Sequence, residues 1–361
     1  MSERSRLPAW LLKRSTLFIL GIPLVALGAI IYITDIPVVV NIYTFFCVNL
    51  MLVLGLQIFM GNSGILAWTH VGWMGIGAFA SSILSVAPMM KSLGVPNMYP
   101  FLVELQTSVP VAIAVGGIVA AIVAALIGWP LMRLSDAAGV ITLFATLIVI
   151  HVVMTQWDNV TNGPRTFFGV QEWTNLWIAL AGALAILVVA HWFRESSWGL
   201  RLRSSRDNRF AAMAMGTSVV QVRYVAFVLS ALIAGLSGGV WAHLITSFSP
   251  KSFYIVEAFT LLTMLVIGGQ GSISGAVVGT TLVTLAREGL RQVEAGINNS
   301  GMFSWEVYGL TELVLAVFLI VVLIWRPSGV IGGQELTWPL LKRKDRAPEQ
   351  GAAESVSTEA G

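Results

Sequence analysis

Long runs of apolar residues, separated by short polar or glycine-rich segments, dominate this chain. A run of about 20 apolar residues is long enough to cross the roughly 30 Å hydrocarbon core of a bilayer as a helix. The pattern therefore predicts an all-α, polytopic membrane helical bundle. Its expected spans are 17–33, 38–60, 65–86, 109–132, 140–154, 176–193, 224–245, 257–267, 274–286 and 303–325.

The number of crossings depends on two of these segments. Segments 257–267 and 274–286 each look too short to cross alone, and 140–154 is also short. Ten spans result if both short segments cross, and eight result if they form one re-entrant hairpin. We expect about ten transmembrane helices, with 8–10 left open.

The composition leaves little room for a water-soluble fold. Of the 361 residues, 56% are hydrophobic and 11% are charged, with a mean hydropathy of +0.82, whereas soluble domains carry about 25% charged residues. Continuous apolar runs also argue against a transmembrane β-barrel, whose strands alternate. The single cysteine, Cys47, lies inside an apolar run, so it has no disulfide or metal-binding companion in this chain.

Basic residues predict the orientation, because Lys and Arg collect in cytoplasmic loops. We expect a cytosolic basic N-terminus at 1–16, with an uncleaved first helix, and a transmembrane domain at 17–326. Within it, Arg133 and the arginine-rich loop 194–223 are expected on the cytosolic side. The remaining residues, 327–361, are expected to form a cytosolic, largely disordered tail. Both termini are then cytosolic.

Two glycine-rich breaks interrupt apolar runs, GNSG at 61–64 and GGQGSISG at 268–275. Broken backbone at membrane depth is tolerated only against protein or a water-filled cavity. Two broken hairpins also hint at two pseudo-repeated halves with a site between them. The alternative is that the glycines only allow close helix packing, and that His70 is a satisfied helix contact. The predicted translocation path comprises Gly61, Asn62, Gly64, Thr69, His70, Gly268, Gly269 and Gly271.

Two motifs that would indicate catalysis are missing from the sequence. It contains no G-x-x-x-x-G-K-[ST] and no H-E-x-x-H. We therefore expect no catalytic residues, no metal site, no cofactor bound by this chain and no enzymatic activity. Charged residues deep within spans are scarce, which argues against coupling to a proton or sodium gradient.

The basic loop contains a short segment with the composition of a helix, DNRFAAMAMG at 207–216. Asp207 is a suitable cap and Gly216 a suitable stop. A helix of this length is about 15 Å long, too short and too charged to span. It is expected either to lie on the membrane surface or to dock on a partner protein. Its alanine and methionine face favours a protein cleft.

Four blocks of sequence resemble the permease subunits of branched-chain amino acid ABC importers, most closely the M-type partner of the two homologous permeases. They begin GILAWTHVGWMG, WGLRLRSSRDNRFAAMAMG, SFSPKSFYIVEAF and WRPSGVIG, and they run in order from about residue 40 to 332. The family usually has Ser-Leu-Gly-His where this chain has Ala67-Trp68-Thr69-His70, and often Pro where this chain has Ala276. These differences lie in the expected translocation path, so the motifs do not identify which substrate is carried.

The resemblance implies an ATP-driven importer of branched-chain or other hydrophobic amino acids, in a bacterial inner membrane. It also implies a second permease subunit, two cytosolic ATPases that bind ATP and Mg, and a periplasmic binding protein. The basic loop would then hold the coupling helix that docks on an ATPase, matched by Arg206, Asp207, Asn208, Arg209, Ala211, Ala212, Met215 and Gly216. Alternatives are a urea or short-amide permease, a stand-alone secondary transporter or channel and, more weakly, a membrane enzyme.

Overall fold

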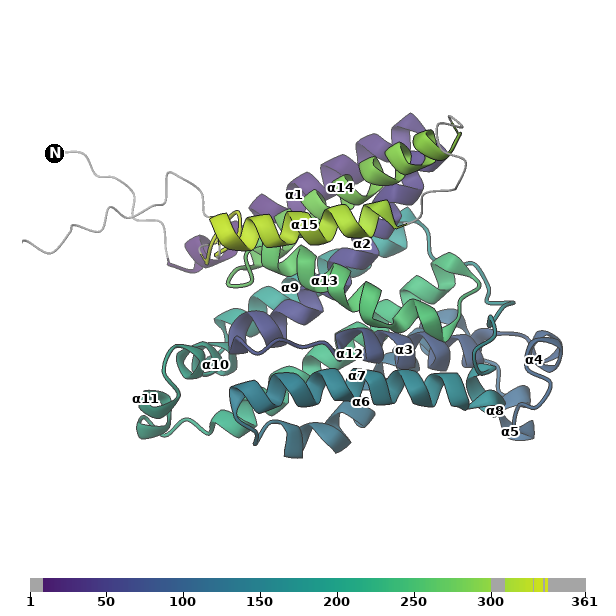
Figure 1. Ribbon diagram of the computed structural model, residues 1–361, viewed down its shortest axis with the longest axis horizontal. Coiled ribbons are helices and arrows are strands. Elements are labelled where there is room, and N and C mark those ends of the chain that lie inside the picture. Colours follow the sequence, from purple (N-terminus) through teal and green to yellow (C-terminus); the bar gives the residue numbers. More distant parts are fainter. Residues whose placement is uncertain (1–8, 300–308, 327, 334, 337–361) are drawn as a thin grey trace, which may run out of the picture.

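The computed structural model describes residues 9–299, 309–326, 328–333 and 335–336, and within these ranges the chain is helical, with one isolated β-bridge between Phe167 and Phe248. The helices are α1 (Ala9–Thr34), α2 (Pro37–Leu56), α3 (His70–Ser85), α4 (Pro88–Gly94), α5 (Pro100–Glu104), α6 (Val109–Leu131), α7 (Asp136–Gln156), α8 (Asp158–Thr161), α9 (Leu176–Glu195), α10 (Ser197–Asp207), α11 (Arg209–Ala214), α12 (Val219–Ile245), α13 (Ile255–Gly268), α14 (Ile273–Asn299) and α15 (Leu310–Trp325) (Figure 1). A π-helical turn, η1 (Gln57–Gly61), extends α2, and a 3₁₀ turn, η2 (Pro250–Phe253), precedes α13.

Apolar helices long enough to cross a membrane confirm the polytopic bundle. By length and composition, seven segments in the described part of the chain qualify. They are Thr16–Thr34, Pro37–Gly61, Val109–Leu131, Asp136–Gln156, Leu176–Glu195, Val219–Ile245 and Pro250–Gly268. The other three predicted segments coincide with α3, α14 and α15, although residues 303–308 lie outside the described ranges.

Two of the length estimates were wrong. Helix α7 has 21 residues instead of the 15 or so expected from 140–154. Helix α14 has 27 residues and continues to Asn299, past the end predicted at residue 286. At about 1.5 Å per residue it extends some 40 Å, which removes the reason for treating it as half of a re-entrant hairpin. The predicted start of the third span, at residue 65, was also early, because α3 begins at His70.

The bundle has two ends of different character (Figure 1). Helices α10 and α11 lie at one end, which we call the basic end, and α4, α5 and α8 lie at the other, which we call the far end (Figure 1). An ion pair between Arg223 at the start of α12 and Asp136 at the start of α7, 2.7 Å apart, also belongs to the basic end.

Helix α12 is the centre of the packing and contacts α2, α3 and α6. Small residues allow the close approach, since Gly77 of α3 faces the backbone of Gly235 in α12. His70 joins three helices. Its Nε2 lies 2.8 Å from the carbonyl oxygen of Leu52 in α2, and its Nδ1 lies 3.2 Å from the hydroxyl of Ser230 in α12.

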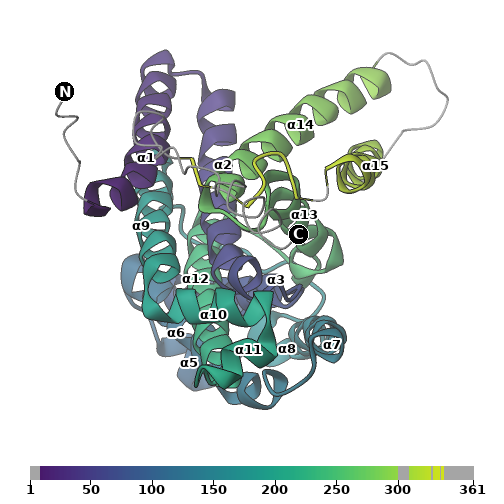
Figure 2. The ribbon, with the colours of Figure 1, turned by 90° about the vertical axis from the view of Figure 1, so that its left-hand side faces the viewer.

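A second group of helices, α13, α14 and α15, lies beside α2 on the other side of it from the α6 side (Figure 2). Helices α13 and α14 form a hairpin that turns at the basic end, and α2 and α3 turn at the same end. Both glycine breaks therefore lie at one end of the bundle. This is the direction expected of parallel repeats, although the repeat itself stays a prediction.

Candidate functional site

The loop between α9 and α12 folds into two short helices, each started by a polar cap. The Ser196 hydroxyl accepts from the amide of Gly199 at 3.3 Å, and the Asn208 carboxamide accepts from the amide of Ala211 at 3.0 Å. The prediction that Asp207 caps this helix was wrong, because Asp207 is the last residue of α10. Gly216 ends the second helix, with a φ of +78° that an L side chain rarely adopts.

Helix α11 has one buried side and one exposed apolar side. The buried side is Ala212, which is 5% exposed, and α11 packs on α12. On the other side Phe210 is 79% exposed, Met213 43% and Met215 86%. We call these three residues the α11 apolar face. Such a face at the tip of a loop is suited to contact with another protein.

The first glycine break is a π-helical turn followed by a non-helical segment. The Asn62 side chain donates to the carbonyls of Gln57 at 3.2 Å and Ile58 at 3.0 Å, which closes the end of the helix. Gly64 follows with a φ of +75°. A side chain at Gly61 would meet the carbonyl oxygen of Gln270. The two breaks, far apart in sequence, therefore contact each other.

The second break is covered by a segment that follows α15. Gly269 has a φ of +114°, a conformation that favours glycine. The amide of Val330 donates to the carbonyl of Ile267 at 2.8 Å, and the amide of Ile331 donates to that of Gly268 at 3.2 Å. Part of the region predicted as tail, residues 328–333 and 335–336, is thus packed on the bundle. Residues 337–361 lie outside the described ranges.

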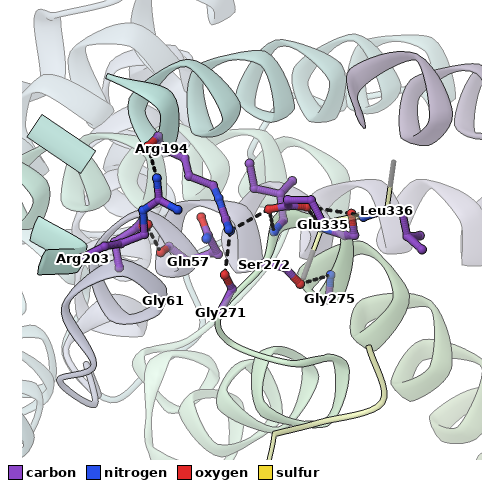
Figure 3. A network of polar contacts seen from close by, with 12 residues as sticks. Gln57, Gly61, Arg194, Arg203, Gly271, Ser272, Gly275, Glu335 and Leu336 are labelled. Carbon is purple, nitrogen blue, oxygen red and sulfur yellow. Dashed lines mark hydrogen bonds and ion pairs between the residues drawn. The ribbon is translucent and has the colours of Figure 1, made fainter. Parts of the chain in front are cut away.

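Two arginines of the basic loop, Arg194 and Arg206, bind backbone carbonyls of the two breaks. Figure 3 shows Arg194 with Gly271 and Glu335. Arg206 donates to the carbonyl of Gly61 at 2.7 Å. Arg194 donates to the carbonyl of Gly271 at 2.6 Å and pairs with the Glu335 carboxylate, also at 2.6 Å. We call these five residues the arginine clamp.

Glu335 also makes a second set of contacts, because its carboxylate caps the first turn of α14. It accepts from the amide of Ile273 at 2.8 Å, and from the amide and hydroxyl of Ser274 at 3.0 and 2.7 Å. A carboxylate at a helix N-terminus is stabilised by the exposed amides and by the helix dipole. The clamp therefore fixes the start of α14 relative to the basic loop.

Several buried polar atoms beside the first break have no hydrogen-bond partner among the described residues. They are both side-chain atoms of the Gln57 carboxamide, Oδ1 of Asn62 and Oγ1 of Thr69. Burying an unpaired polar group costs about 1–3 kcal/mol. Such groups are usual where water, a ligand or a second conformation supplies the missing partner.

The residues predicted for the path and for the coupling helix occupy distinct places. Gly61, Asn62, Gly64, Gly268, Gly269 and Gly271 all lie in the two breaks, while Thr69 and His70 are buried at the start of α3. Asp207 and Asn208 are exposed, Arg209, Ala211, Met215 and Gly216 belong to α11 or its end, and Arg206 reaches back to the first break. Their role in transport stays a prediction.

Sequence reasoning missed Arg194, Glu335 and Gln57 as members of this site. The closing WRPSGVIG block pointed to the segment that carries Glu335 but not to its partner. Among the residues that the structure describes, no three His, Cys, Asp or Glu side chains come together as a metal site would require.

Comparison with known proteins gives a consistent family. The sequence profile described as branched-chain amino acid transport system / permease component matches residues 38–325. The chain is 26% identical over 343 residues to the high-affinity branched-chain amino acid transport system permease protein LivM of Escherichia coli, covering 85% of this chain and 72% of that one. It is 22% identical over 311 residues to the LivH permease of the same organism, covering 79% and 92%.

A third relative is similar over a shorter stretch. The guanosine ABC transporter permease protein NupQ of Bacillus subtilis is 35% identical over 106 residues, which cover 29% of this chain and 31% of that one. No solved structure matches the chain.

Proposed function

This chain belongs to the family of branched-chain amino acid transport permease components, and we propose that it is the membrane-spanning subunit of an ATP-driven importer for branched-chain and other hydrophobic amino acids. It would pair with a second, homologous permease, since relatives of both the LivM and LivH kinds match it. Two ATPases would supply the energy from ATP and Mg, and a periplasmic binding protein would deliver the substrate.

The orientation in the membrane follows from the basic end. Its Arg133, Arg194, Arg201, Arg203 and Arg206 favour the cytosol, because Lys and Arg are retained on the cytoplasmic side. The far end would then face the periplasm of a bacterial inner membrane, and both termini would be cytosolic.

The observation that carries the proposal is the connection between the α11 apolar face and the two glycine breaks. Helix α11 offers exposed Phe210 and Met215 to a cytosolic partner. The helix before it, α10, ends near Arg206, which holds Gly61. Movement of α11 by an ATPase would therefore be transmitted to the first break, and Arg194 would transmit it to the second.

The breaks are also where the path is expected to close on the cytosolic side. Unpaired polar atoms on Gln57, Asn62 and Thr69 would gain water or substrate as partners when the contact between the breaks opens. Broken backbone at membrane depth is tolerated where it is buried in protein or lines a water-filled cavity, and such breaks are typical of the sites of alternating-access transporters.

Other functions have less support. A stand-alone transporter or channel needs no exposed apolar face on a loop helix. A urea, short-amide or nucleoside permease fits the same fold, and the NupQ similarity keeps the nucleoside class in the family. The amino-acid proposal is favoured because the LivM similarity extends over most of the chain.

The test is a pair of matched substitutions. Met215→Asp places a charge in the α11 apolar face, and Met89→Asp changes another strongly exposed methionine at the far end. We expect Met215→Asp to reduce co-purification of co-expressed ATPases at least about tenfold, since a central apolar contact contributes about 1–2 kcal/mol or more. Met89→Asp should leave the amount of bound ATPase unchanged. Equal co-purification of both variants with the wild type would overturn the proposal.

A further inference from the structure

A cavity of about 620 Å³ lies between α2, α12, α13 and α14, apart from the arginine clamp. Its walls come from the first half of α2, the last turns of α12 and the second half of α14. Since α2 ends and α14 begins at the basic end, the cavity lies toward the far end of the bundle. Its apolar lining includes Ile42, Phe45 and Met264.

The lining also carries charges of both signs. Glu257 and Arg287 face each other at 3.8 Å, and Glu288 and Arg291 at 3.1 Å, and all four line the cavity. Arg287 is fourteen residues along α14, which places it about 21 Å from the basic end of that helix. A charged side chain at such a depth is costly unless it faces water or a partner, and it commonly marks a substrate route.

The geometry of the first pair leaves room for a ligand. At 3.8 Å the Arg287 guanidinium and the Glu257 carboxylate are farther apart than a hydrogen bond requires. Both side chains remain partly exposed, at 39% and 21%. The Thr284 hydroxyl, which also lines the cavity, is buried and has no partner among the described residues. The cavity lining thus offers unused hydrogen-bonding groups, and its two arginines and two glutamates sum to a net charge of zero.

We propose that this cavity is a binding site for a zwitterionic amino acid with an apolar side chain, a proposal that rests on the proposed function and names the site. The α-carboxylate would bind the Arg287 guanidinium, whose planar donors match a carboxylate. The α-ammonium would bind the Glu257 carboxylate. The side chain would lie against Ile42, Phe45 and Met264, so that the ligand separates the loose ion pair and replaces each partner with an equivalent charge.

A simpler explanation is that the two ion pairs only hold α13 against α14. The two explanations differ in what dissolved amino acids do to the cavity. If the ion pairs are only structural, leucine should not change the access of a thiol reagent to the cavity. If the cavity binds a zwitterion, bound leucine should block that access. Analogues that lack one charge separate the two further, because leucinamide lacks the carboxylate and 4-methylpentanoate lacks the ammonium group.

The experiment uses a thiol at the cavity wall as the reporter. Ser252 lines the cavity, and Ser252→Cys is introduced with Cys47→Ala into the full chain, together with its partner permease in lipid nanodiscs. The rate of labelling by a small water-soluble methanethiosulfonate is measured with leucine, leucinamide or 4-methylpentanoate. Leucine at about three times its dissociation constant should slow labelling about fourfold, and equal concentrations of the analogues should have little effect.

Substitutions of the charged residues then test whether Arg287 and Glu257 bind the two charged groups of leucine. Arg287→Gln and Glu257→Gln should abolish the protection by leucine, while Arg165→Gln, a change of an exposed arginine at the far end, should preserve it. Absence of protection by leucine in the reporter chain with all four charges intact would overturn the proposal, whatever the variants do. Equal protection by leucine and both analogues would also overturn it, because it would show an apolar site.

Uptake by the complete importer is measured separately. Leucine uptake without leucine protection refutes this site and leaves the proposed function standing. Selective protection by leucine without ATP-driven uptake supports the site and refutes the proposed function.

Discussion

The ion pair between Arg194 and Glu335 gives the sharpest test of the arginine clamp. The perturbation is Glu335→Ala, which removes the carboxylate and keeps the backbone. In the structure this carboxylate lies 2.6 Å from Arg194 and accepts three hydrogen bonds from Ile273 and Ser274. The Arg194 side chain is 7% exposed, so its charge would be left buried without a paired carboxylate in contact, and its hydrogen bond to the Gly271 carbonyl would remain.

The expected cost has two parts. Loss of the cap on α14 costs about 1 kcal/mol. Breaking a buried pair by removal of one partner costs about 3–5 kcal/mol, and we take about 3 because Glu335 is partly exposed and Arg194 keeps one hydrogen bond. The sum is about 4 kcal/mol of unfolding free energy. Arg194→Met should cost about 2 kcal/mol, since Glu335 keeps its three donors on α14 and only the charge-assisted bonds are lost.

The double variant decides whether the two residues act together. If they are independent, the costs add to about 6 kcal/mol. If they form the pair described here, the double variant should cost about 3 kcal/mol, because no unpaired charge remains and the coupling is then about 3 kcal/mol. The measurement is chemical unfolding in one fixed detergent, followed by tryptophan fluorescence.

Glu104→Ala serves as the control, since Glu104 is an exposed acid at the far end, and it should change the unfolding free energy by less than about 0.5 kcal/mol. Additive costs in the double variant would refute the coupling. A cost for Glu335→Ala no larger than that of the control would refute the pairing itself.

Three further predictions concern the orientation, the packing of the second break and the path. On a Cys47→Ala background, Ser204→Cys should react with an impermeant thiol reagent only from the cytosolic side. Ser204 is exposed on α10, whereas the next residue, Ser205, is buried. Labelling of Ser204→Cys by this reagent in intact cells would refute the orientation. Gly279→Ala should lower the unfolding free energy by at least about 2 kcal/mol, because a methyl group there meets the backbone of α13, whereas Gly289→Ala, with open space, should not; equal stabilities would contradict the packing. Thr69→Cys, at a fully buried position, should be unreactive at rest and reactive during ATP turnover, and a rate near zero in both states with transport intact would remove Thr69 from the path.

The packing of α11 decides which substitution can test docking on a partner. Ala212→Glu would place a charge on this loop helix. In the structure Ala212 is buried within the chain itself, so this substitution would disturb α11 and α12. The exposed Met215 tests docking without that complication.

The sequence by itself determined the class of the protein and the approximate positions of its apolar helices. Transfer of apolar residues into lipid is a sum over neighbouring positions, so a run of suitable length identifies a span without reference to the rest of the chain. The same local logic located the two glycine breaks and the short loop helix. It also identified the family, whose ordered motifs are local as well.

Prediction from local sequence failed in two situations. In one, two adjacent residues were equally suitable as a helix cap. In the other, charged residues within a helix were explained only by partners distant in the sequence. Asp207 and Asn208 are both good caps, and the choice of Asn208 follows from α10 ending one residue earlier. Helix α14 looked short because Arg287 and Glu288 interrupt its hydropathy. Its length became clear only with Glu257 on α13 and the cavity that these charges share.

The tertiary structure alone decided how the site is assembled. The bond from Arg206 to Gly61 joins residues 145 positions apart, and the bond from Arg194 to Gly271 joins residues 77 apart. No periodicity or spacing encodes such pairs, because each depends on how α2, α9 and α14 pack against one another. Hydrophobicity acts at every position independently, whereas a buried arginine is stabilised only where the folded chain brings a carbonyl or a carboxylate to it.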